Sequence, residues 1–172
     1  MCGRDWSSDV CSSDLPNGED LALTMSMFAG QYQCKIDEKG RFVVPSPIRE
    51  EIESNGNNLM FLKSQDVPVL AYTQPEWNNR LQEAKEKLDD DQRRLFMYHM
   101  VSEATPSEMD RAGRILIPSR LRKLIPVDDE QEVVIVGMFH RLEIWNPSEW
   151  RLFARKNEET FEQVLGKLQG IL

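Results

Sequence analysis

The chain has 172 residues, of which 29% are charged and 40% hydrophobic, proportions that are typical of a globular protein. Its 21 lysines and arginines against 29 aspartates and glutamates give a net charge of −8, which argues against a uniformly basic surface for nucleic acids. No apolar stretch approaches the ~20 residues that a membrane-spanning helix needs, so we expect no membrane partner.

The first 26 residues do not fit the pattern of the rest. Residues 1–26 have no period, and they lack the basic and apolar regions of a secretion signal. Residues 7–15 resemble the translation of a common sequencing-adapter oligonucleotide. We interpret 1–26 as a non-native leader, with Met25 or Met27 as the natural start; a genuine disordered tail is the alternative. Cys34 would then be the only cysteine, which indicates a reducing cytoplasm and a structural role for that residue.

A ten-residue motif occurs twice, 73 positions apart. DEKGRFVVPS at 37–46 returns as DRAGRILIPS at 110–119. In each copy Asp and Gly favour a tight turn, because Asp bonds its own backbone two residues on and Gly tolerates positive φ. The three apolar residues that follow predict a strand, which proline ends. A short helix is expected next, capped by Ser46 in the first copy and by Ser119 in the second.

The residues around each motif extend the repeat into a module. Residues 32–36 predict a strand before the first turn, so the motif would lie at the tip of a hairpin. Two more apolar segments follow in each copy, at 59–62, 69–72, 133–137 and 142–145. The pattern predicts an α+β fold of two repeated β-hairpin-rich modules, residues 31–74 and 104–147, with intervening and C-terminal helices.

Helices are predicted after each module. An amphipathic spacing begins at Trp77 in the connector, residues 75–103. Three consecutive aspartates, 89–91, suit the start of a second helix there, because negative charge stabilises a helix N-terminus. Residues 148–172 predict a closing C-terminal helix with its own apolar face.

We find no pattern that predicts an enzyme, a metal site or a cofactor. The two histidines, His99 and His140, share no ligand spacing with cysteine or acidic residues. His99 lies among apolar residues on a predicted helix, which favours a core or interface position. Four motif residues are assigned a turn-forming role: Asp37, Gly40, Asp110 and Gly113. No small-molecule substrate is expected.

Positive charge gathers at the two motifs instead. Residues 35–49 hold four cations and two acids, and residues 108–123 hold five cations and two acids. An arginine that follows glycine at a turn can present its charge to an anion. The acidic residues concentrate outside these segments.

The paired DxxGR motifs, each followed by three apolar residues and Pro-Ser-x-x-Arg, resemble the MraZ family of bacterial transcriptional regulators. Each module resembles the SpoVT/AbrB-type swapped-hairpin DNA-binding domain, and the likeness covers 27–172. It implies binding to double-stranded DNA at tandem G-rich direct repeats, usually as a repressor of the division and cell-wall gene cluster. It also implies a ring-shaped homo-oligomer in the cytoplasm, associated with the nucleoid. The alternative is a non-DNA assembly protein or antitoxin-like scaffold with the same fold.

The resemblance also implies which residues contact DNA. Loss of the motif arginine abolishes DNA binding in such proteins, and basic residues two before the Asp and eight after the Arg contribute. In the second copy Glu108 replaces the basic residue two before the Asp, so we expect the first copy to bind DNA more strongly. The candidate DNA contacts are Arg41, Arg114, Lys35, Lys39, Arg49, Arg111 and Arg122.

Overall fold

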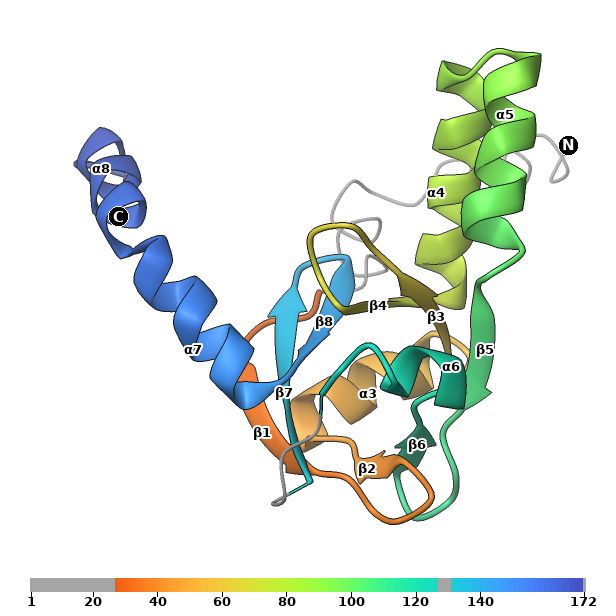
Figure 1. The fold of residues 1–172 in the computed structure, drawn as a ribbon, viewed down its shortest axis with the longest axis horizontal. Helices are drawn as coiled ribbons and strands as arrows, with labels where there is room; N and C mark the ends of the chain where they lie inside the picture. Colours follow the sequence, from red (N-terminus) through yellow and green to blue (C-terminus); the bar gives the residue numbers. More distant parts are fainter. Residues whose placement is uncertain (1–26, 127–130, 172) are drawn as a thin grey trace, which may run out of the picture.

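The computed structural model of the chain describes residues 27–126 and 131–171, and the predicted leader lies outside them (Figure 1). In chain order the elements are β1 (Gln31–Lys35), β2 (Arg41–Val43), α3 (Ser46–Ser54), β3 (Asn58–Lys63), β4 (Val69–Thr73), α4 (Gln74–Lys87), α5 (Asp90–Phe96), the π-helical turn η1 (Met97–Val101), β5 (Thr105–Glu108), β6 (Arg114–Leu116), α6 (Ser119–Arg122), β7 (Glu132–Met138), β8 (Arg141–Trp145), α7 (Pro147–Lys156) and α8 (Glu158–Lys167). This mixture of helices and strands, repeated with the predicted offset, confirms the α+β prediction.

The main sheet interleaves strands of both repeats. Its order is β1-β7-β8-β4-β3-β5, and every neighbouring pair is antiparallel. Strand β1 of the first repeat pairs with β7 of the second, and β5 of the second repeat pairs with β3 of the first. The repeats therefore share one sheet and do not fold as two separate units.

The hairpin predicted within each motif is only partly correct. The turn closes as expected, since the Asp37 N–H donates to the Arg41 carbonyl and a single bridge joins Ile36 to Phe42. Beyond that bridge, β2 pairs with β6 of the other repeat, with Phe42 opposite Ile115. A three-residue strand cannot bury an apolar face alone, and this exchange lets both inward side chains enter the common core.

The core lies on both faces of the main sheet. One cluster of buried side chains joins the sheet to α3, β2, β6 and α6, and includes Phe42, Phe61 and Ile135. A second cluster includes Trp77 and Trp145 and lies beneath α4 and α7. Complete burial of such a side chain contributes about 1.5–3 kcal/mol, so the apolar strands of both repeats stabilise one fold.

Cys34 belongs to the first cluster, and its burial raises the pKa of the thiol to about 11. A thiol with so high a pKa is almost entirely protonated at neutral pH and is a poor nucleophile. The structural role predicted for Cys34 is confirmed.

Two predictions about helix starts have different outcomes. Asp89 caps α5 and forms a capping box with Gln92, as the run of aspartates predicted. The capping role of Ser46 and Ser119 is wrong, because the helices begin at these serines and no side-chain cap bond forms. Each serine follows a proline that occupies the N-cap position, so its hydroxyl stands too far into the helix to act as a cap.

Two pairs of helices extend from the body of the molecule (Figure 1). Helices α4 and α5 lie side by side, whereas α7 and α8 form an elongated arm that changes direction at Asn157. The single C-terminal helix that we predicted is therefore two helices. Large apolar side chains remain exposed on both extensions: Leu95, Met97, Tyr98, Leu152, Phe153, Phe161, Val164 and Leu165. Among the described helices, none combines the length and the apolar character needed to cross a bilayer.

Candidate nucleic-acid interface

The first motif folds into a turn that its aspartate holds together. Asp37 Oδ1 accepts the backbone N–H groups of Lys39 at 3.0 Å and Arg41 at 2.8 Å. Its other oxygen, Oδ2, accepts from Arg41 Nε at 2.7 Å. Gly40 has a φ of +88°, in the left-handed region that glycine tolerates best. One carboxylate thus shapes the backbone and fixes the arginine that follows the glycine.

The second motif repeats this geometry bond for bond. Asp110 Oδ1 accepts from the backbone N–H groups of Ala112 and Arg114, both at 2.9 Å. Asp110 Oδ2 accepts from Arg114 Nε at 2.9 Å. Gly113 has a φ of +74°. The structure therefore contains two equivalent turns, each with an arginine oriented by its own aspartate.

Both aspartates are held in the ionised form. The backbone N–H of Arg41 is the main cause that lowers the pKa of Asp37, and the Arg41 side chain adds to it. The backbone N–H of Arg114 acts in the same way on the pKa of Asp110. At neutral pH each turn therefore combines a carboxylate with a guanidinium.

The arginines keep donors that their aspartates do not use. Within the described residues, Arg41 and Arg114 are bonded to the protein through Nε, and their Nη atoms make no hydrogen bond there. Their side chains are 28% and 38% exposed. Because guanidinium carries five donors in a fixed fork, the Nη groups can still bind two acceptors on one ligand.

Each turn lies against an arginine that comes from the helix of the other repeat. A Cβ built on Gly40 would lie 2.0 Å from Nη1 of Arg122, which belongs to the second repeat. A Cβ on Gly113 would lie 1.7 Å from Nη2 of Arg49, which belongs to the first. Arg49 Nη2 also donates to the carbonyl of Ala112 at 3.4 Å. Each turn is thus covered by the arginine of the opposite repeat.

Backbone hydrogen bonds also connect each repeat to the turn of the other. The Val44 N–H donates to the Gly113 carbonyl at 2.8 Å, and the Ile117 N–H donates to the Gly40 carbonyl at 3.0 Å. With the antiparallel pairing of β2 and β6, these bonds fix the two turns relative to each other. The site is consequently one unit built from both motifs.

The other predicted contacts lie around this unit to different extents. Lys39 and Arg111 are exposed within the turns. Lys35 is exposed at the end of β1, opposite Glu132, in the main sheet rather than in the β2–β6 ribbon. The structure thus brings the arginine pairs of both repeats together, whereas Lys35 belongs to the main sheet, opposite Glu132.

The two turns differ in their charged surroundings. A pocket of about 600 Å³ beside the second turn is lined by Glu53, Glu108, Asp110 and Arg111, among others. Glu108 is exposed and ends β5, which leads into this turn. Glu53 and Glu108 therefore place negative charge beside the second turn.

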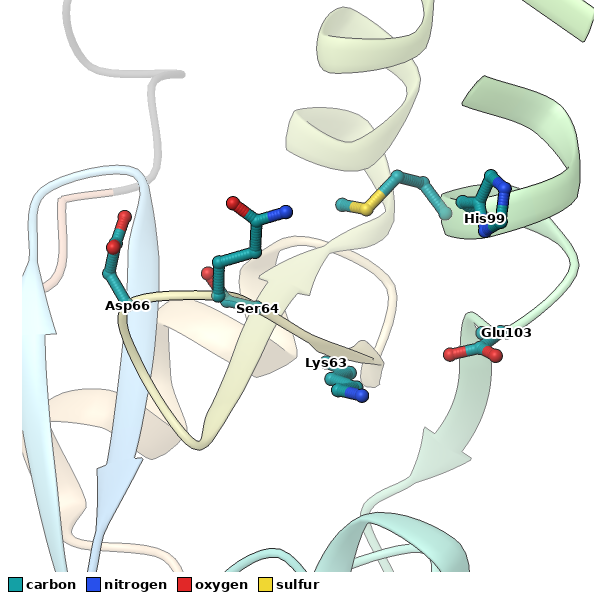
Figure 2. A pocket seen from close by; sticks show the side chains of 7 residues that line it. Lys63, Ser64, Asp66, His99 and Glu103 are labelled. Atoms are coloured by element: carbon teal, nitrogen blue, oxygen red, sulfur yellow. The ribbon is translucent and has the colours of Figure 1, made fainter. Parts of the chain in front are cut away.

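A second pocket, of about 680 Å³, lies between the β3–β4 loop and η1 (Figure 2). Lys63, Asp66 and Glu103 border it, but their side chains do not point toward one common centre in Figure 2. His99 is exposed there, so the core position that we considered for it is wrong. Among the described residues, no group of three or more His, Cys, Asp or Glu side chains could hold a metal ion.

Sequence reasoning missed two features of the interface. The crossing of Arg49 and Arg122 depends on the exchange of strands, and no local pattern signals it. The second feature is the exposed pair Val43 and Leu116. The sequence could have indicated it, because each of them lies two positions after a motif arginine, and residues two apart on a strand lie on the same face.

Comparison with known proteins gives one consistent result. The two repeats, residues 27–98 and 100–170, each match the family model described as "MraZ protein, putative antitoxin-like". Transcriptional regulator MraZ of Ligilactobacillus salivarius is 37% identical over 141 residues, which cover 80% of this chain and 94% of that protein. The protein of the same name from Desulforamulus reducens is 35% identical over 147 residues, covering 85% of this chain and all of that protein.

Proposed function

Because this chain belongs to the MraZ family, we propose that it is a sequence-specific DNA-binding regulator of transcription. The observation that carries this proposal is the pair of turns at the β2–β6 ribbon, each offering the unbonded Nη groups of an oriented arginine. A two-stranded ribbon fits the major groove of duplex DNA. Arginine is also the side chain that most often binds guanine O6 and N7 with two hydrogen bonds.

The target that we propose is a set of tandem G-rich direct repeats upstream of the division and cell-wall gene cluster, where the protein would act as a repressor. Two oriented arginines favour guanine, which supports a G-rich site. Such a regulator would work in the cytoplasm, in association with the nucleoid.

We further propose that the protein assembles into a ring of identical subunits. The exposed apolar side chains on α5, η1, α7 and α8 support self-association, because large apolar patches on a monomer commonly mark interfaces. A single subunit offers few cations and has a net charge of −8. A ring would present the same ribbon at fixed intervals, so tandem sites would gain affinity through multivalency.

The test uses duplex DNA from upstream of the gene for this protein. Arg41→Ala and Arg114→Ala should each weaken binding by roughly 5- to 150-fold, the range that corresponds to ~1–3 kcal/mol per guanine contact. Lys85→Ala, which removes an exposed cation on α4, is the matched control and should bind normally. Binding should also weaken steeply as salt increases. Retained affinity in a folded double variant would contradict the proposal.

The alternative function, an assembly scaffold that does not bind DNA, is favoured by the words "antitoxin-like" in the family description. Gel filtration with and without the upstream duplex separates the two functions. A regulator should co-elute with the DNA, whereas a scaffold would elute at the same volume in its presence and absence.

A further inference from the structure

The outer face of the β2–β6 ribbon carries two exposed apolar side chains between its arginines. Val43 is 57% exposed and Leu116 is 42% exposed. Phe42 and Ile115, which alternate with them along the strands, point to the opposite face and are buried. The outer face therefore has no role in the core, although it carries β-branched and γ-branched side chains.

The register makes arginine and apolar side chains alternate both along and across this face. Arg41 lies opposite Leu116, and Val43 lies opposite Arg114. Side chains directly opposite each other on an antiparallel pair share a face, with Cβ atoms about 4.5–5.5 Å apart. Along each strand the arginine and the apolar residue are two positions apart, which is about 6.8 Å. Each arginine thus has one apolar neighbour on its own strand and one across the ribbon.

These spacings correspond to those of stacked bases. Successive bases of one DNA strand are about 3.4 Å apart, so an apolar side chain would meet the groove within about two base steps of its arginine. The ligand for this face must accept hydrogen bonds at two diagonal points and offer apolar groups beside them. In the major groove, guanine supplies the acceptors, and the C5-methyl group of thymine is the apolar feature among the base edges.

The exposed residues around this face favour DNA over an apolar protein partner. Lys39 and Arg111 are exposed in the flanking turns, where they outnumber the one exposed acidic residue, Glu38, beside the apolar pair. Positive charge at the border matches the phosphate backbone on either side of the groove.

We infer that Val43 and Leu116 contact thymine methyl groups next to the guanines bound by Arg41 and Arg114. The ribbon would then recognise dinucleotide steps that contain guanine and thymine. This inference rests on the proposed function, since it assigns part of the specificity of the same site. It adds apolar recognition of a base to recognition by charge.

The experiment compares two forms of the same upstream duplex, amplified with dTTP or with dUTP. Deoxyuridine pairs like thymidine and lacks only the methyl group. The wild-type protein should bind the uracil form about fourfold more weakly for each methyl group removed from the interface, because one methyl group is worth about 0.8 kcal/mol. The Val43→Ala, Leu116→Ala double variant should bind the thymine form more weakly and should no longer distinguish the two forms.

Met138→Ala is the matched control, because Met138 is 45% exposed at the end of β7, outside the ribbon and outside the helical extensions. It should keep the wild-type preference for thymine. Equal binding of both duplexes by the wild-type protein would overturn the inference while leaving the proposed function intact, and this comparison needs no variant to fold. An unchanged preference in the double variant would also overturn it. If the wild-type protein bound neither duplex, the proposed function would fail and the inference with it.

Discussion

Arg122 lies across Gly40, so close that a Cβ on the glycine would be 2.0 Å from its Nη1 atom. These two residues belong to different repeats, and Arg49 has the same relationship to Gly113. Each turn is consequently completed by an arginine supplied from the opposite repeat. The duplication therefore gives two half-sites, each consisting of one turn and the arginine that covers it. A change in one repeat should consequently affect the turn of the other.

Gly40→Ala is expected to weaken DNA binding more than it weakens the fold. Its positive φ costs roughly 1–2 kcal/mol for a residue with a Cβ, and the new methyl group must displace Arg122. Gly56→Ala is the matched control, because Gly56 has a φ of +96° and nothing within 4 Å of a built Cβ. Urea unfolding should give similar losses for both variants, whereas binding to the upstream duplex should fall only for Gly40→Ala. Equal binding by the two variants would show that the glycine serves the backbone alone.

Crossed coupling between arginines is the second expectation. Because Arg122 covers the turn that positions Arg41, alanine substitutions at these two sites should be non-additive in DNA binding. A coupling free energy of about 0.5–3 kcal/mol is typical of residues in one network. The pair Arg41 and Arg49 serves different turns and should be additive within ~0.5 kcal/mol. Binding measured across both double-mutant cycles tests this, and stronger coupling within a repeat than between repeats would refute the crossed arrangement.

Much of this fold could be predicted from sequence because its signals are local. Apolar runs located the described strands except β5, whose sequence TPSE is not apolar, and Asp89 marked a helix start that the structure confirms. The turns followed from the pairing of Asp with Gly at a fixed distance. The partner of β2 could not be derived from local pattern, since Phe42 is equally apolar whether it pairs within its own repeat or with Ile115. Only the resemblance to swapped-hairpin domains implied the exchange.

The crossing of Arg49 and Arg122 illustrates the same limit within the site. Their positions eight residues after each motif arginine suggested contacts of their own repeat with DNA. The exchange of β2 and β6 moves each of them to the other turn, where they are half-buried. Long-range pairing therefore decided which groups make up each half-site.

Asp37→Asn should separate the two roles of this carboxylate. An amide oxygen can still accept the backbone N–H groups of Lys39 and Arg41, but the amide nitrogen cannot accept from Arg41 Nε. The turn should therefore persist while the arginine loses its orientation. We expect an unfolding midpoint in urea between those of the wild-type protein and Asp37→Ala, because the backbone bonds remain while the stabilising negative charge is lost, together with reduced affinity for the upstream duplex. Asp37→Ala should lower both stability and affinity; equal stability of the Asn and Ala variants would argue against a backbone role.

Acid should weaken the fold through these same carboxylates. The pKa of Asp37 and of Asp110 lies below the ordinary value of 3.8, so their contribution is complete above that pH and is lost as the pH falls through the folded-state pKa. The pair should therefore add no pH dependence between pH 5 and 8. Urea midpoints followed from pH 5 downward should fall less steeply for the Asp37→Asn, Asp110→Asn double variant than for the wild-type protein. Parallel curves would mean that other carboxylates dominate acid unfolding.

Glu108→Lys should strengthen the half-site that we expect to be weaker. Glu108 is exposed at the end of β5 and lines the acidic pocket beside the second turn, so lysine can be accommodated there without loss of packing. The change removes a negative charge near Arg114 and adds a cation that can reach phosphate. Each added phosphate contact should steepen the dependence of log affinity on log salt by about 0.9. The measurement is binding to the upstream duplex over a series of salt concentrations.

The matched control for this variant is Glu86→Lys, which makes the same change of charge on the exposed side of α4. If only overall charge mattered, both variants would gain affinity equally and with the same salt slope. Arg114→Ala should cost less affinity than Arg41→Ala in the wild-type background, and this difference should shrink when Glu108 is lysine. A difference that stays constant, or an Arg114→Ala loss that already equals that of Arg41→Ala, would mean that the charge at position 108 does not set the unequal strength of the two turns.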